Sequence, residues 1–524
     1  MGAGERNGGV SLADLLGTFS LATDLGLGQP MEHVLRSWWI AGRIGEHMGL
    51  GEAERADLYY TAVLAWVGCV ADTPEVASWF GDDIAFRADS FGVDFSGLPA
   101  MAFMVQHAGA GSSPWHRLRL ATTLVATGGR GVERGLASHC VSTSTMAERL
   151  GLSARVGDGL RQFFSRWDGT GVPDGVGGDR IARSMRLFHL ADVVEVFHRT
   201  AGVEAAVDVA RVRRGTKFDP VIVDVFCAAA PEVLADLTDD LDLLAVVAGD
   251  PVLQQPLVGR GLDDALEVVA DFTDLRSSYR AGHSRGVARL AGRAADAAGL
   301  PAGDVEAVRR AGLLHDVGLH GVPASILDKP GPLTATESER LRANSYYTER
   351  MLARPPALAR LAEIASLSHE RLDGSGYHRG LTGAALPATA RILAAADAFH
   401  AMTEPRPHRP ALSSREATAA LRHDVRAGRL APDAVDAVLT AAGAARPRRR
   451  TGPAGLTPRE VEVLVLIARG ASTRQVARRL GIAPKTAGTH IERIYGKTGV
   501  STRSGAALAA VAHGLLDTLG PLDP

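Results

Sequence analysis

Four residues in the second half of the chain have the types and spacing of a metal-binding site. His315 and Asp316 directly follow an apolar-patterned helical stretch. His283 lies upstream on a separate predicted helix, and Asp397 lies on a later one. Imidazole and carboxylate ligands that several helices bring together suit a hard or borderline divalent metal ion. A metal ion held there can activate water for attack on a phosphate group.

An internal repeat indicates which elements position these ligands. When the chain is shifted by 250 residues, His33 falls on His283, and a nearby Ala-Gly-Arg motif recurs in register. Further along, the shift becomes 205 residues, and Asp192 falls on Asp397. A period of this length indicates two tandem domains rather than a solenoid. The first copy carries an insertion, at about 73–130, for which the sequence indicates no function.

The sequence around the ligands is similar to a known enzyme family. The segments HSRGVARLAG, LLHDVGLHGVPASILDKPGPLT, SHERLDGSGYHRGL and ARILAAADAFHAMTEPRPHRPALS resemble an HD-GYP domain over about residues 275–440. HD-GYP domains are the HD phosphohydrolases that hydrolyse cyclic di-GMP. The resemblance implies metal ligands at His283, His315, Asp316, His369 and Asp397. If the domain is an active hydrolase, Asp316 is also its catalytic residue.

Several positions depart from the HD-GYP pattern. Asn344 and Ser368 replace two further histidines, and Leu319 replaces a lysine that helps to hold substrate phosphate. The GYP motif reads Gly-Tyr-His, so that His378 stands in place of its proline. A bimetallic site needs its full set of ligands. We therefore expect Fe or Mn, with one ion or none, and leave open whether His320 or His378 is a substitute ligand.

The first copy has lost more of the pattern. Ala65-Trp66 replaces the His-Asp pair, and Phe163-Phe164 replaces the paired histidines. The remaining ligand-type residues are scattered and are explained as hydrogen-bonded core groups: His33, His139 and Asp192. We expect residues 1–245 to form a non-catalytic HD-GYP-like domain.

The last seventy residues carry the pattern of a helix-turn-helix. Capping boxes at 457–460 and 472–475 begin two helices, and Gly481 ends the second. A third helix is predicted over 485–497 and a fourth over about 502–515. Short helices joined by a tight turn, with basic residues along them, are typical of modules that read a DNA groove.

The stretch LTPREVEVLVLIARGASTRQVARRLGIAPKTAGTHIERIYGKTGV resembles the LuxR-type DNA-binding domain over its whole length. The resemblance implies four helices, dimerisation through the last one, and insertion of the third into the major groove of double-stranded DNA. Two departures predict weak or shape-driven reading: Ala483 replaces a capping serine, and Gly488 lies within a helix, where it costs about 1 kcal/mol relative to Ala. The predicted DNA contacts are Lys485, Thr486, Gly488, Thr489, Glu492, Arg493 and Lys497.

The distribution of charge supports DNA binding independently. Residues 446–503 carry a net charge of +10, residues 1–445 carry −10 and residues 504–524 carry −2, so the overall charge is only −2. Clustered Lys and Arg side chains bind DNA by neutralising its phosphates. The alternative is a solvated basic domain that binds another protein.

Composition limits the fold and the compartment. The chain has 524 residues, of which 46% are hydrophobic, and its apolar residues recur at helical spacing, which predicts an all-α protein. Three distant cysteines and the absence of a long apolar run favour a cytoplasmic protein without a membrane partner. The predicted domains are 1–245 and 246–440 (HD-GYP-like), 441–454 (a Pro/Arg-rich linker) and 455–524 (the DNA-binding domain).

Two functions remain as hypotheses. In the first, the protein is a homodimeric transcription factor whose HD-GYP-derived body is a sensor or dimerisation module with little or no hydrolysis. A candidate ligand is a cyclic dinucleotide or another phosphorylated molecule. In the second, it is a metal-dependent cyclic di-GMP phosphodiesterase with a DNA-binding output domain. The missing lysine and the two missing imidazoles favour the first.

Overall fold

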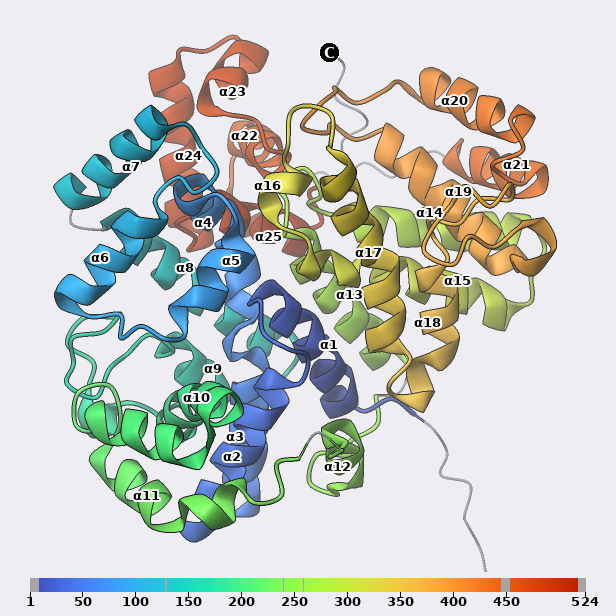
Figure 1. Cartoon of the computed structure of the whole chain (residues 1–524). Helices are drawn as coiled ribbons and strands as arrows, with labels where there is room; N and C mark the ends of the chain where they lie inside the picture. The colour runs from blue at the N-terminus through green and yellow to red at the C-terminus, as the bar shows by residue number, and fades with distance from the viewer. Residues whose placement is uncertain (1–8, 128–129, 239, 258, 444–452, 517–524) are drawn as a thin grey trace, which may run out of the picture. The chain divides into compact units, whose positions relative to one another are not determined.

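The structure of the chain, a computed structural model, is built from helices (Figure 1). It describes all residues except 1–8, 128–129, 239, 258, 444–452 and 517–524. Within this described part there is no strand, and the β-type pairs are isolated bridges. The expected all-α fold class is confirmed. No described helix combines the length and the hydropathy that crossing a bilayer requires.

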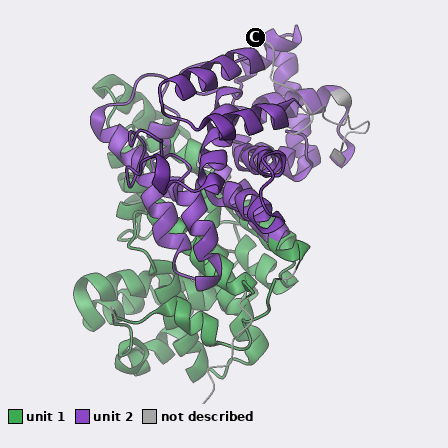
Figure 2. Ribbon diagram, turned by 90° about the vertical axis from the view of Figure 1, so that its right-hand side faces the viewer, with its two compact units in different colours: residues 1–262 green, residues 263–524 purple. Residues whose placement is uncertain are grey.

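The chain divides into two compact units, residues 1–262 and 263–524 (Figure 2). The boundary expected after residue 245 falls inside helix α12 (Leu243–Gly249). This helix packs on α1 and α2 of the first unit and buries both of its leucines, so it belongs to that unit. The expected linker, 441–454, lies mostly outside the described residues.

The first unit is organised around its N-terminal helix, α1. Leu15, Leu16, Phe19 and Leu21 are each at most 2% exposed, as expected for a helix that is apolar on most sides. α1 packs against α2 and α3, and α10 packs against the same two helices. The helices of this unit are α1 (Leu12–Gly26), α2 (His33–His47), α3 (Glu52–Ala65), η1 (Val67–Val70), α4 (Thr73–Phe80), α5 (Asp83–Ser90), α6 (Gly97–His107), α7 (Pro114–Thr127), α8 (Arg130–Arg149), α9 (Ala154–Arg161), η2 (Gly178–Arg180), α10 (Arg183–Val212, kinked at Gly202), α11 (Pro220–Leu234) and α12.

In the second unit, helix α14 is central and packs against α15, α19 and α21. A Cβ atom on Gly312 of α15 would lie 2.8 Å from Cα of Ala288 on α14, so glycine allows these two helices to approach closely. The helices up to residue 442 are α13 (Arg260–Asp274, which begins just before the unit boundary), α14 (His283–Ala297), α15 (Ala302–Leu314), η3 (Val317–Gly321), α16 (Ala324–Leu327), α17 (Ala335–Leu352), η4 (Pro356–Leu358), α18 (Ala359–Ser366), η5 (Gly383–Ala385), α19 (Ala388–Met402), α20 (Ser414–Arg426) and α21 (Pro432–Ala442).

One local arrangement occurs in both units. α2 and α14 each begin at a histidine and have the same length, and a residue of left-handed conformation precedes each of them. Asp24 accepts a hydrogen bond from the backbone N–H of Val34, and Asp274 accepts one from that of Ser284. Burial raises the pKa of both carboxyl groups to about 7. These pairs of residues are separated by the 250-residue shift of the sequence repeat.

The C-terminal helices follow the predicted helix-turn-helix closely. They are η6 (Pro453–Gly455), α22 (Pro458–Ala468), α23 (Thr473–Leu480), α24 (Pro484–Thr498) and α25 (Arg503–Ala512). Both predicted capping boxes are present, and Ala483 provides no side-chain cap for α24, as expected. The fourth helix ends three residues earlier than predicted, because Gly514 has a positive φ of 63° directly after the C-cap.

Candidate metal centre and nucleic-acid interface

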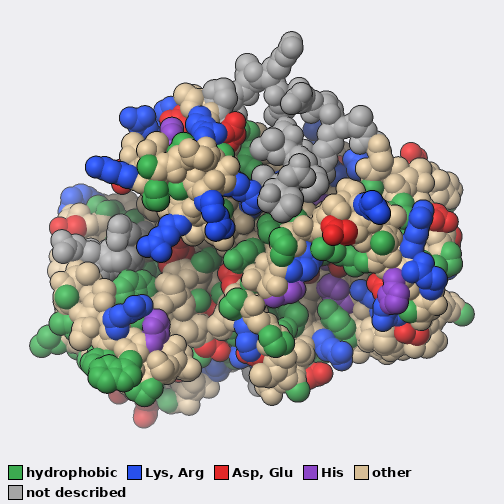
Figure 3. Space-filling model, turned by 90° about the horizontal axis from the view of Figure 1, so that it is seen from above, with side chains coloured by type: hydrophobic (Ala, Val, Ile, Leu, Met, Phe, Trp, Pro, Cys, Tyr) green, Lys and Arg blue, Asp and Glu red, His purple; other side chains and the backbone are tan. Residues whose placement is uncertain are grey.

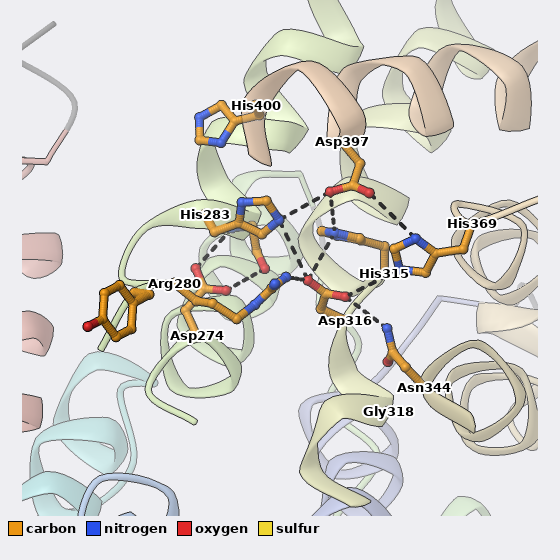
Figure 4. A network of polar contacts seen from close by, with 12 residues as sticks. Asp274, Arg280, His283, His315, Asp316, Gly318, Asn344, His369, Asp397 and His400 are labelled. Carbon is orange, nitrogen blue, oxygen red and sulfur yellow. Dashed lines mark hydrogen bonds and ion pairs between the residues drawn. The ribbon is translucent and has the colours of Figure 1, made fainter. Parts of the chain in front are cut away.

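The five ligands expected from the HD-GYP resemblance lie together in the second unit (Figure 4). His283 is the first residue of α14, His315 and Asp316 follow α15, His369 lies in the loop after α18, and Asp397 is on α19. The Nε2 atom of His283 lies 3.2 Å from Oδ1 of Asp397. That of His315 lies 3.1 Å from Oδ2 of Asp316. Nδ1 of His369 lies 3.6 Å from Oδ2 of Asp397.

The donor atoms of this cluster fit a divalent metal ion. His283, His315 and Asp397 each offer a ligand atom, and these atoms all lie within 4.8 Å of one another. Both Nε2 atoms are buried without a hydrogen-bond partner. Since buried polar atoms are normally satisfied, a bound cation explains these two. Burial lowers the pKa of both His283 and His369 to about 4, so their imidazoles are neutral and able to bind a metal near pH 7.

Hydrogen bonds at Nδ1 orient the buried imidazoles of His283 and His315. Nδ1 of His283 lies 2.7 Å from Oε2 of Glu404, and Nδ1 of His315 lies 2.9 Å from the carbonyl oxygen of Gly312. Nδ1 is therefore the protonated nitrogen in each ring, and the lone pair of Nε2 faces the cluster. Glu404, which lies just beyond the C-cap of α19, was not predicted from the sequence.

The positions that depart from the HD-GYP pattern do not supply a second set of ligands. The Nδ2 amide of Asn344 donates a hydrogen bond of 2.9 Å to Oδ1 of Asp316. Leu319 is 2% exposed and packs with Val322 and Ile326. Nε2 of His378 lies 2.7 Å from Glu349. Among the described residues, neither His378 nor His320 belongs to a group that could hold a metal.

An arginine side chain that was not predicted from the sequence also lies in the cluster. The guanidinium group of Arg280 forms an ion pair with Oδ2 of Asp316, and its Nε is buried without a hydrogen-bond partner (Figure 4). Burial, followed by the nearby charge of Arg406, lowers the pKa of Arg280 to about 10. Its position three residues before His283 is the signal that could have identified it.

A buried carboxylate shapes the loop that replaces the GYP motif. Glu370 is 1% exposed and accepts hydrogen bonds from the backbone N–H groups of Arg379, Gly380 and Leu381. The ring of Tyr377 stacks on His369 with a centroid separation of 5.0 Å. The loop therefore holds one ligand of the cluster in place through an aromatic contact.

The equivalent position in the first unit is closed by protein groups. His33 contacts Glu195 through Nδ1 at 2.6 Å and Asp192 through Nε2 at 3.2 Å. The indole N–H of Trp66 donates to the same Asp192 oxygen at 2.8 Å. Although burial lowers it, the two carboxylates raise the pKa of His33 to about 10. A protonated imidazole between two carboxylates is not a metal ligand.

His139 of the first unit is a core residue rather than a ligand. Its Nε2 lies 2.7 Å from the carbonyl oxygen of Ala65, and its ring stacks on Phe163. Its Nδ1 is near Cys69 and Asp72, a group that could hold a metal. However, the guanidinium group of Arg87 contacts Asp72 at 2.7 Å, so a cation is already paired with that carboxylate.

The predicted DNA contacts lie on one face of α24. The opposite face, Ala487, Ile491 and Ile494, is buried. Lys and Arg side chains gather over the C-terminal helices in Figure 3. Lys497 is exposed but also forms an ion pair of 2.7 Å with Glu460 within the domain. Of the predicted contacts, Gly488 is partly exposed and the following are exposed: Lys485, Thr486, Thr489, Glu492, Arg493 and Lys497.

Comparisons with known proteins agree with both resemblances. Residues 267–433 match the family described as HD domain, and residues 454–510 match the luxR family of bacterial regulatory proteins. The 3′3′-cGAMP-specific phosphodiesterase 3 of Vibrio cholerae is 31% identical over 419 residues, which cover 79% of this chain and 91% of that protein. A cyclic di-GMP phosphodiesterase of Thermotoga maritima is 39% identical over 150 residues, covering 28% of this chain and 41% of that protein.

A solved structure extends the likeness beyond the HD domain. The crystal structure of a cyclic GMP-AMP specific phosphodiesterase of Vibrio cholerae is similar with a TM-score of 0.59 and 28% identity, over 84% of this chain and 99% of that one. This coverage includes much of the first unit. The chain therefore belongs to the HD-domain family that contains the 3′3′-cGAMP-specific phosphodiesterase 3 of Vibrio cholerae, and it ends in a DNA-binding domain of the luxR family.

Proposed function

We propose that the protein is a DNA-binding transcriptional regulator whose HD body senses a phosphorylated ligand, such as a cyclic dinucleotide, with little or no hydrolysis. The hydrogen bond from Asn344 to Asp316 is the observation that carries this proposal. An amide N–H cannot bind a metal ion. The Asn344 amide occupies Oδ1 of Asp316 from a position where the HD-GYP family has an imidazole. The buried Leu319 likewise offers no charge to a phosphate.

The output of this regulator is DNA binding. The exposed face of α24 carries the side chains expected to contact double-stranded DNA, and the net charge of +10 over 446–503 favours phosphate contacts. We propose that it acts as a cytoplasmic homodimer, as LuxR-type domains do. A ligand in the HD body would change DNA binding only through a difference in its affinity for the two states of the protein.

The first unit supports the proposal as a non-catalytic HD-GYP-like domain. The local arrangement around α2 and α14 recurs at the spacing of the sequence repeat. The pairing of His33 with two carboxylates stabilises this domain without a metal. We propose a role for it in ligand-dependent coupling or dimerisation.

A metal-dependent phosphodiesterase is the second candidate, and the unsatisfied Nε2 atoms of His283 and His315 favour it. These two residues and Asp397 would hold one Fe or Mn ion, with Asp316 and His369 beside it. When bound, the metal would supply a Lewis acid for water activation. Glu404 would orient His283, whose burial keeps the imidazole neutral, and the buried cluster would exclude bulk water.

Metal content and turnover of the full chain distinguish these functions. Protein purified without chelators is analysed for Fe and Mn, then incubated with 3′3′-cGAMP and cyclic di-GMP beside an Asp316→Ala control. DNA binding is measured with and without each cyclic dinucleotide. Ligand-dependent DNA binding without turnover supports the regulator, and turnover that the control abolishes supports the enzyme. A protein that binds neither DNA nor these nucleotides would exclude both functions.

A further inference from the structure

Arg280 lies in the turn between α13 and α14 and directs its guanidinium group into the metal-ligand cluster (Figure 4). Its side chain is 17% exposed, and Nη2 forms the ion pair with Oδ2 of Asp316. Its buried Nε has no hydrogen-bond partner. A guanidinium group has five N–H donors in a planar fork, so Arg280 retains donors for a further acceptor.

The charge balance of the cluster depends on a cation. Three carboxylates, Asp316, Asp397 and Glu404, face two guanidinium groups, those of Arg280 and Arg406. With neutral imidazoles, these five groups leave an excess of one negative charge. A divalent ion reverses the sign of this balance, so a bound metal favours the approach of an anion.

The HD-GYP family has a lysine that helps to hold substrate phosphate, and this chain has Leu319 in its place. Leu319 is buried among apolar side chains, 2% exposed, and cannot reach a ligand. Arg406 is already held by Glu404 at 3.1 Å and by the carbonyl oxygen of Tyr279 at 3.2 Å. Among the described residues, Arg280 is the arginine that forms an ion pair with one of the five expected metal ligands, Asp316.

We propose that Arg280 is the phosphate-binding cation of this site. When Asp316 turns to the metal ion, the guanidinium fork is released to bind a non-bridging oxygen of a phosphate ester beside that ion. Arg–phosphate contacts of this kind are charge-assisted and can be bidentate. The inference rests on the proposed function only in that the HD body takes a phosphorylated ligand.

The test measures the affinity of the full chain for inorganic phosphate by calorimetry, with and without bound Mn²⁺. In the Mn²⁺-loaded protein, we expect Arg280→Ala to weaken phosphate binding at least tenfold at unchanged Mn²⁺ content. Arg280→Lys keeps the charge but not the fork and should lose less. Arg415→Ala, which removes an exposed arginine on α20, is the matched control and should have no effect. Without metal, phosphate binding should be weak in every variant.

Arg280→Gln covers the case in which the alanine variant loses metal or fold, because glutamine can still donate a hydrogen bond to Asp316. Equal phosphate affinity of this variant and the unsubstituted protein, at equal Mn²⁺ content, overturns the proposal. The absence of phosphate binding in the Mn²⁺-loaded protein overturns it as well. Since the measurement needs neither DNA nor turnover, a protein that fails to bind DNA would contradict the regulator while leaving this result intact.

Discussion

Asn344 donates its Nδ2–H to Oδ1 of Asp316 across 2.9 Å, in a position where the HD-GYP family has an imidazole. The two residues lie on different elements, Asn344 on α17 and Asp316 directly after α15. Both are at most 1% exposed. One oxygen of Asp316 is thus occupied by an amide and the other by Arg280, so no part of this carboxylate is left for a second metal ion.

Restoring the imidazoles should restore a second metal position. We expect the double variant Asn344→His and Ser368→His to raise the metal content from about one to about two ions per chain, measured by mass spectrometry after equilibration with Mn²⁺. Asn344→Leu, which removes the N–H donor but adds no metal ligand, is the control. A double variant that still binds a single ion would contradict the role assigned to Asn344.

Glu404 should act on the metal through His283. We expect Glu404→Ala to lower metal affinity by about tenfold to a hundredfold, because the imidazole loses the partner that fixes its tautomer and orientation. Glu404→Gln can still accept the hydrogen bond from Nδ1 and should lose less. Metal titration of the folded variants checks this order, and equal affinity in all three proteins would exclude a positioning role for Glu404.

The buried pair of His33 and Glu195 should make the stability of the first unit depend on pH. The folded pKa of His33, about 10, lies above its ordinary value of 6.5. The stabilisation is therefore complete below pH 6.5 and is lost as the pH rises toward 10. For Glu195, the folded pKa of about 2 keeps the carboxylate ionised until the pH falls well below 4.5.

A substitution at His33 isolates the contribution of this residue to the pH dependence of stability. We expect His33→Gln to lower the free energy of unfolding by roughly 3 kcal/mol near pH 6, because two buried carboxylates lose their cation. The difference from the unsubstituted protein should shrink by up to about 1.4 kcal/mol per pH unit above pH 7. Denaturant unfolding at pH 6, 7.5 and 9 measures it. A difference that stays constant with pH would show that His33 is neutral in the folded protein.

Removal of the exposed cations of α24 should weaken binding to all DNA sequences by a similar factor. We expect Lys485→Ala and Arg493→Ala each to lower affinity for every tested duplex and to reduce the slope of log affinity against log salt by about one. Fluorescence anisotropy at several salt concentrations measures both quantities. Arg415→Ala serves as the control, and an unchanged salt slope in both variants would place the DNA contact elsewhere.

Lys497 should behave differently from these two residues. Its ammonium group is paired with Glu460, the capping-box carboxylate of α22. Lys497→Ala should therefore reduce the thermal stability of the domain as well as its DNA affinity. A loss of affinity with unchanged thermal stability would show that the contact with Glu460 does not stabilise the fold.

The sequence by itself determined the features that depend on neighbouring residues. The capping boxes at Thr457 and Ser472 are each made within four residues of chain, so they are legible before folding. The same holds for the adjacent pair His315 and Asp316. The all-α class follows from such local patterns, because helix hydrogen bonds join residues four apart.

Only the tertiary structure decided what those residues contact. Arg280 meets Asp316, Asn344 meets the same carboxylate, and Glu404 meets His283 across 121 residues of chain. In the first unit, His33 reaches Glu195 across 162 residues, and its metal-ligand pattern becomes an ion pair. Such contacts are set by the packing of α14 on α15 and α19, and of α2 on α10. This packing also sets the burial of each ionisable side chain and therefore shifts its pKa. No local sequence pattern encodes that burial.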